Sequence, residues 1–166
     1  MHMNGSAIAV TSDGARPSAH LNLATTPKEH QMSITLTDQD KNTLRTAAYG
    51  AVSLMAAADM AGKPHRAATE GSLALAAATG VIGHVLAAKI KDIDMNVKSV
   101  AELADRTLPA LTASMALLKA QDPEEADNFR STVMIAVESA ARTQRGGLSP
   151  TTADMIRKIT AALDAA

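Results

Sequence analysis

Alanine accounts for 35 of the 166 residues and fills many apolar positions that most chains give to larger side chains. Aromatic residues are almost absent, with one tyrosine, Tyr49, one phenylalanine, Phe129, and no tryptophan. Alanine has the highest intrinsic helix propensity of the amino acids. This composition therefore predicts an all-α protein, a single bundle of five to six helices whose backbones approach one another closely.

The overall composition excludes several classes of protein. With 46% hydrophobic and 20% charged residues, the chain is typical of one globular domain. The absence of cysteine excludes a disulfide scaffold, a thiol nucleophile and a zinc ribbon. A net charge of −1 argues against a dedicated nucleic-acid binder. No nucleophile elbow, P-loop or dinucleotide fingerprint occurs, so nothing in the sequence indicates an enzyme.

The first 35 residues differ from the rest. They are rich in Ser, Thr, Asn, Gly and Pro and show no sustained hydrophobic period, which predicts a disordered tail over residues 1–35 and a helical domain over 36–166. The tail lacks the basic start and apolar stretch of a signal peptide, so we expect a cytoplasmic protein. Because Met32 directly precedes the structured part, one hypothesis makes Met32 the natural start.

Cap residues and prolines divide the domain into helices. The five predicted helices begin at Thr37, at Pro64, at Ser99, at Asp122 and at Ser149. The first is expected to end before Gly62, and the second to run to about Lys91. Pro109 removes a backbone hydrogen bond from the third, which should therefore kink or split.

Residues 71–88 contain no charged side chain except that of His84. The length approaches that of a membrane span, but three glycines, a serine, a threonine and this histidine argue against one. Gly80 and Gly83 give the segment a small-residue surface that permits close approach of another helix. It is either a central buried helix or, with His84, the interface of a homodimer.

The first and fourth predicted helices resemble each other when shifted by 85 positions. The identical pairs are Arg45/Arg130, Ala51/Ala136, Val52/Val137, Ala56/Ala141 and Gly62/Gly147. In both places a helix ends at a glycine turn and a proline opens the next helix. This pattern favours two pseudo-repeated helix–turn–helix halves.

The two turns resemble those of tellurite-resistance TerB-like helical domains. The segment 56–59 followed by Gly62 and Glu70 is similar to the first family motif, and residues 140–141 followed by 146–150 are similar to the second. The resemblance covers about 36–163 and implies a two-halved helical fold, a stress-response role and divalent-metal binding at acidic turn residues. The chain departs from the pattern at Gln144, which stands where the first copy has Asp59.

Four carboxylates are candidate ligands for a divalent metal. Asp59 and Glu70 flank the first turn and could share a cation. Asp92 and Asp94, with Asn96, place oxygens at alternate positions as the opening of a calcium loop does. The same residues also fit ordinary solvated surfaces, because the glycine and the bidentate glutamate of a calcium loop are missing.

Basic side chains gather near the second turn, at Arg142, Arg145, Arg157 and Lys158. They form either a solvated surface or a site for an acidic partner or phosphate. Taken together, the sequence favours a non-enzymatic interaction module that self-associates, since an alanine core buries little area per residue and gains from a second subunit. The alternative is a divalent-metal or small-ligand-binding protein that uses acidic residues at its helix turns.

Overall fold

The computed structural model describes residues 34–59, 62–88 and 96–166. A compact unit begins at Ile34 and extends to Ala166. The predicted tail up to residue 33, including Met32, lies outside the described residues. In the described ranges the regular secondary structure is helical without a strand, which confirms the all-α prediction.

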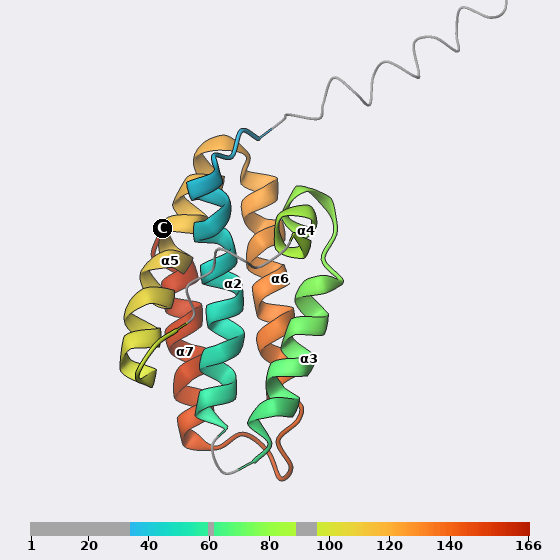
Figure 1. Cartoon of the computed structure of the whole chain (residues 1–166), viewed down its shortest axis with the longest axis vertical. Helices are drawn as coiled ribbons and strands as arrows, with labels where there is room; N and C mark the ends of the chain where they lie inside the picture. Colours follow the sequence, from blue (N-terminus) through green and yellow to red (C-terminus); the bar gives the residue numbers. More distant parts are fainter. Residues whose placement is uncertain (1–33, 60–61, 89–95) are drawn as a thin grey trace, which may run out of the picture. The chain divides into compact units, whose positions relative to one another are not determined.

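The described residues of this unit form six helices (Figure 1). They are α2 (Asp38–Ala58), α3 (Pro64–Ala76), α4 (Gly80–Ala87), α5 (Val100–Gln121), α6 (Pro123–Ala141) and α7 (Pro150–Asp164). No helix of the described residues is long and apolar enough to cross a bilayer.

The predicted helix starts are confirmed by their cap geometry. The Thr37 hydroxyl accepts a hydrogen bond from the Asp40 amide, and the Asp40 carboxylate accepts one from the Thr37 amide. This reciprocal pair satisfies two amides that the first turn leaves without helical partners. The side chains of Ser99, Asp122 and Ser149 likewise accept from amides at the starts of α5, α6 and α7.

The predicted single helix from Pro64 to about Lys91 is wrong, because two helices, α3 and α4, occupy this segment. Gly80, the first residue of α4, has φ +74°, a left-handed conformation that interrupts a continuous α-helix at this point. A Cβ atom on Gly83 would collide with the Ala78 carbonyl, so the turn folds tightly back on α4. Helix α4 is also peripheral, since Ile82 and Leu86 are buried while His84 is exposed. It is not a central buried helix.

Helix α5 is not split at Pro109, contrary to one of the two predicted effects of this residue. Pro109 is exposed, so the backbone carbonyl that loses its hydrogen bond is near solvent. The opposite side of α5 carries the buried residues Leu103, Leu111 and Leu118.

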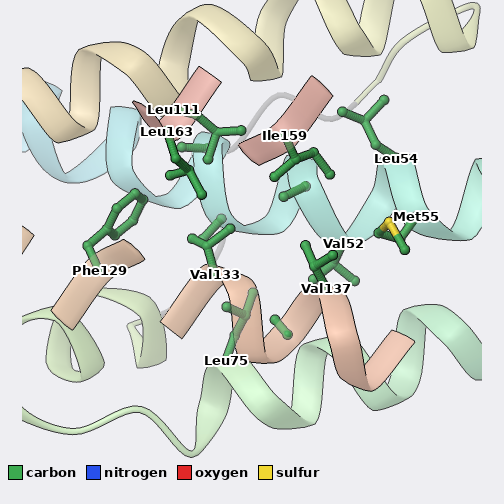
Figure 2. Packing of buried hydrophobic residues seen from close by; sticks show 14 of the residues in the cluster. Val52, Leu54, Met55, Leu75, Leu111, Phe129, Val133, Val137, Ile159 and Leu163 are labelled. Carbon is green, nitrogen blue, oxygen red and sulfur yellow. The ribbon is translucent and has the colours of Figure 1, made fainter. Parts of the chain in front are cut away.

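Helix α2 lies in the middle of the bundle and contacts each of the other five helices. Helices α5 and α7 lie on one side of it, and α3 and α6 on the other (Figures 1 and 2). Ala47, Ala48 and Ala51 on α2 are fully buried. These small side chains let the neighbouring backbones come close, as the alanine content predicts, and larger side chains from all sides complete the core around Phe129.

Two side chains of α2 hold the end of α4. The Tyr49 hydroxyl donates to the Leu86 carbonyl at 2.8 Å, and the Arg45 Nε donates to the Val85 carbonyl at 2.9 Å. These carbonyls belong to the last turn of α4 and have no helical partner. Burial raises the pKa of Tyr49, and the positive charge of Arg45 partly offsets this rise.

Candidate functional site

The α2–α3 turn and the α6–α7 turn lie at the same end of the bundle (Figure 1). The fully buried Thr152 of α7 connects them, because its hydroxyl donates to the Ala58 carbonyl of α2 at 3.5 Å. We call these turns the first corner, residues 58–59 and 62–64, and the second corner, residues 141–152. Each corner is built around one polar side chain that follows a helix: Asp59 comes directly after α2, and Gln144 lies beyond the turn residues Arg142 and Thr143 that follow α6.

In the first corner this side chain is the Asp59 carboxylate, which is only 6% exposed. One of its oxygens accepts a hydrogen bond from the Lys63 amide at 3.2 Å. A Cβ atom on Gly62 would overlap the Asp59 carboxylate. Glycine is therefore needed at position 62 because a buried carboxylate occupies the space of a side chain.

In the second corner the polar side chain is the Gln144 amide. Its oxygen accepts from the Ser149 amide at 3.2 Å, and its nitrogen donates to the Thr152 hydroxyl at 2.6 Å. The Ser149 hydroxyl donates to Thr152 at 3.0 Å. Gly146 and Gly147 have φ values of +81° and +94°, and a Cβ on either would meet nothing within 4 Å. Glycine is needed here for backbone conformation, not for space.

The corners share one hydrogen-bonding arrangement. Asp59 and Gln144, which the shift of 85 positions aligns, each accept from the amide of the residue that caps the next helix, Lys63 or Ser149. In both, a proline follows that cap. The packing of the two helix pairs differs, because α3 contacts α6 most extensively whereas α7 contacts α5 most extensively. The likeness of the two halves is therefore closest at the turns.

Between the corners lies a cavity of about 400 Å³, the corner pocket. Its lining includes the side chains of Asp59, Lys63, Arg66, Gln144, Arg145 and Ser149, and the backbone of Gly146 and Gly147. Within the described parts of the chain, no carboxylate lies within ion-pair distance of these three cations. The described lining of the pocket thus contains three cations without an ion-pair partner in the described ranges and one carboxylate, so its net charge is positive.

The structure separates the predicted metal-ligating residues. Asp59 lines the corner pocket, whereas Glu70 lines a neighbouring cavity of about 250 Å³ together with Arg66 and Arg142. Among the described residues, no group of three His, Asp or Glu side chains could hold a metal ion. Asp92 and Asp94 lie outside the described residues, so the structure gives no placement for them.

The predicted interface residues lie around α4. Gly80 supplies the left-handed conformation at the start of this helix, and Gly83 faces the chain's own Ala78 carbonyl. His84 is exposed and lines a shallow cavity of about 430 Å³ beside Lys41. Both glycines thus have a role within the chain, and the dimer interface at this place stays a prediction.

The structure divides the predicted basic patch into two parts. Arg157 and Lys158 both pair with Asp154 at 3.1 Å, and hydrogen bonds from Lys158 and Arg157 lower the pKa of Asp154. Arg142 and Arg145 have no such partner among the described residues. Instead Arg145 lines the corner pocket with Lys63 and with Arg66 of α3, and Arg142 lines the neighbouring cavity with Arg66. Sequence reasoning did not connect Lys63 and Arg66 with them. The aligned turns were the signal that could have suggested this grouping.

Two large apolar side chains are strongly exposed on the outer surface of α3 and α6, namely Leu73 at 60% and Ile135 at 53%. The two helices are antiparallel (Figure 1), and Gly71 of α3 packs against the Ala136 carbonyl of α6. Because Leu73 is two residues from Gly71 and Ile135 is next to Ala136, both lie at nearly the same height along the bundle. We call this surface the α3–α6 face.

Comparison with known proteins adds no relative to this description. No family model, no curated protein and no solved structure matches the chain.

Proposed function

We propose that this protein is a non-enzymatic helical interaction module that self-associates through the α3–α6 face. The observation that carries the proposal is the exposure of Leu73 and Ile135 at one height of two adjacent helices. Single exposed apolar side chains are common on protein surfaces, but neighbouring ones on a helical surface mark contact sites. A second copy would cover both.

The charges around this face suit a two-fold dimer. Glu70 and Glu138 accompany Arg66 and Arg142 on the same two helices. A two-fold interface brings each surface against itself, so carboxylates of one copy can meet arginines of the other. Burying a leucine or isoleucine side chain completely is worth roughly 1.5–3 kcal/mol. Since both are already half covered, we expect a weak, concentration-dependent dimer.

The TerB-like resemblance adds a context to this proposal, since it implies a stress-response role. The divalent-metal alternative depends on the same resemblance and on Asp59 and Glu70. It has less support from the geometry, because those two carboxylates line different cavities beside arginines.

Sedimentation analysis over a concentration series tests the proposal. We expect a monomer–dimer equilibrium for the natural sequence and a shift to monomer for the double variant Leu73→Glu/Ile135→Glu. Both positions are exposed, so the fold should survive, and circular dichroism checks that it does. Leu148→Glu is a matched control, because Leu148 is 49% exposed but lies in the second corner.

A third variant, Val81→Glu, tests the other predicted interface. Val81 is 39% exposed and lines the cavity that contains His84. Dissociation by Val81→Glu alone would move the interface from the α3–α6 face to α4. A natural protein that remains monomeric throughout the series would contradict self-association altogether.

A further inference from the structure

We infer that the corner pocket is a binding site for a dianionic phosphate group, either free or carried as a monoester on a small molecule. The inference depends on the charges that line this pocket and not on the α3–α6 face. The phosphate site and the proposed self-association can therefore be tested independently of each other.

The first step is the contrast between paired and unpaired cations. Elsewhere in the described residues most cationic side chains have an oxygen partner: Arg45 with Val85, Arg106 with Glu102, Lys119 with Ala166, Arg130 with Asp164, and Arg157 and Lys158 with Asp154. At the corner, the charged groups of Lys63, Arg66 and Arg145 have no oxygen partner among the described residues, although Asp59 is near. Three exposed like charges border one cavity, and an anion bound there would offset their mutual repulsion.

The second step concerns the carboxylates nearby, which could reduce this attraction. Asp59 is buried, and one of its oxygens is bound to the Lys63 amide. Glu70 lines the neighbouring cavity, where Arg66 and Arg142 are also present. The Asp59 carboxylate thus stabilises the turn. Among the described lining residues, cations outnumber carboxylates in both cavities, so the attraction for an anion remains.

The third step is access to the backbone. A Cβ on Gly146 or Gly147 would meet nothing within 4 Å, so this wall of the pocket is bare backbone bordering open space. The opposite wall contains the start of α3, where Lys63 caps the helix without a side-chain hydrogen bond. The positive end of the helix dipole adds to the attraction of the side chains for an anion.

The last step identifies the ligand class. Guanidinium groups match the oxygen geometry of phosphate and can donate two parallel hydrogen bonds. Two arginines and a lysine suit a group with two negative charges better than a single carboxylate. The cavity of about 400 Å³ lies within the range of small-molecule sites and has room for more than a phosphate ion.

Titration of the full-length protein with inorganic phosphate, and separately with the monoester phenyl phosphate, tests this site. Amide NMR signals report binding by residue, and sodium chloride at matched ionic strength is the control. We expect saturable shifts centred on Gly62, Gly146 and Gly147. Arg66→Gln and Arg145→Gln should each weaken binding by about tenfold, because each removes one charge-assisted donor to the phosphate oxygens.

Matched variants make the outcome decisive. Arg157→Gln removes a surface arginine outside the pocket and should leave phosphate affinity unchanged. Asp59→Asn should preserve or strengthen binding, since it removes the one carboxylate in the pocket. Tighter binding of the monoester would assign the phosphate to a phosphorylated small molecule, and equal binding would assign it to free phosphate.

Three results would overturn the inference: shifts that chloride reproduces, an absence of saturation, or equal losses in Arg157→Gln and Arg66→Gln. The sedimentation experiment is read separately. A monomeric protein that still binds phosphate would remove the proposed self-association and retain this site, and a dimer without phosphate binding would do the reverse.

Discussion

The two corners of the bundle are built from the same elements but depend on different physical causes. Each has a polar side chain after a helix, a glycine in the turn, and a proline at the start of the next helix. In the first corner, a buried charged group, Asp59, excludes any side chain at position 62. In the second, the neutral Gln144 belongs to a hydroxyl–amide network, and the glycines are needed for their positive φ.

This difference shows that two turns with the same order of polar residue, glycine and proline can be stabilised by different interactions. In the first corner the Asp59 carboxylate fills the space beside Gly62, so the glycine is needed because of a close contact. The second corner leaves its glycines open, so their backbone can line a cavity. Substitutions at aligned positions of the two corners should therefore lower the free energy of unfolding through different mechanisms.

The largest effect is expected for Thr152→Val. The Thr152 hydroxyl is fully buried, accepts from Gln144 and Ser149, and reaches the first corner at Ala58. Its loss leaves buried polar groups without partners, which should lower the free energy of unfolding by about 2 kcal/mol. Chemical denaturation measures this. The exposed neighbour Thr151→Val is the control, and similar losses in both variants would show that the network does not stabilise the corners.

Gly147→Ala should have the next largest effect. Alanine in a left-handed conformation is unfavourable by about 1–2 kcal/mol, whatever space surrounds it. Gly147→Asn should be milder, because asparagine tolerates this conformation better. Denaturation of both variants measures the difference, and a Gly147→Ala protein as stable as the natural one would mean that the turn adopts another conformation.

Gly62→Ala should destabilise by about 1 kcal/mol, through overlap with Asp59 and not through φ. The test is a double-mutant cycle. In an Asp59→Ala background the overlap disappears, so the same Gly62→Ala substitution should then have little effect. If its effect were undiminished in that background, the two corners would not differ in the way described.

Alkaline pH should loosen α4 and leave the corners unaffected. The pKa of Tyr49 in the folded state is raised above its ordinary value of 10.0, so the unfolded chain loses the phenol proton first. The contribution of Tyr49 is therefore complete below pH 10.0 and is lost as pH rises through the raised pKa. Tyrosinate absorbance follows this one tyrosine directly. A native pKa at or below 10.0, or loss of the Gly62 and Gly147 amide signals in the same pH range, would contradict the prediction.

The smallest effect is expected from divalent metals. Thermal melts with EDTA, then calcium, magnesium, manganese and zinc, should show no shift, because Asp59 is the one carboxylate among the described lining of a positively charged pocket. A ligand that binds only the folded state must raise the midpoint. A rise that Asp59→Ala abolishes and Asp38→Ala preserves would favour the metal alternative over the phosphate site.

The sequence predicts the helices better than their connections. Thr37, Ser99, Asp122 and Ser149 are recognisable caps because a cap acts on amides within its own first turn. The break between α3 and α4 was not predicted, since an alanine-rich segment favours a helix locally. The turn at 77–79 depends on the left-handed Gly80 and on the contact of Gly83 with Ala78.

At the candidate site, too, single residues were predicted from the sequence but their grouping was not. Sequence reasoning joined Asp59 to Glu70 as candidate metal ligands, and it grouped Arg142 and Arg145 with Arg157 and Lys158 as one basic patch. The structure places Asp59 and Arg145 in one cavity with Lys63 and Arg66, and it pairs Arg157 with Asp154. Spacing along one helix could not reveal this, because the residues come from turns about 85 positions apart.

By itself, the sequence determined the helical class and the cap residues, because helix propensity and capping depend on interactions within a few residues. The tertiary structure alone decided which turns meet, which cations remain unpaired and which apolar side chains stay exposed. Those features depend on how α2 is surrounded by the other helices, and contacts between distant segments follow from packing the whole core at once.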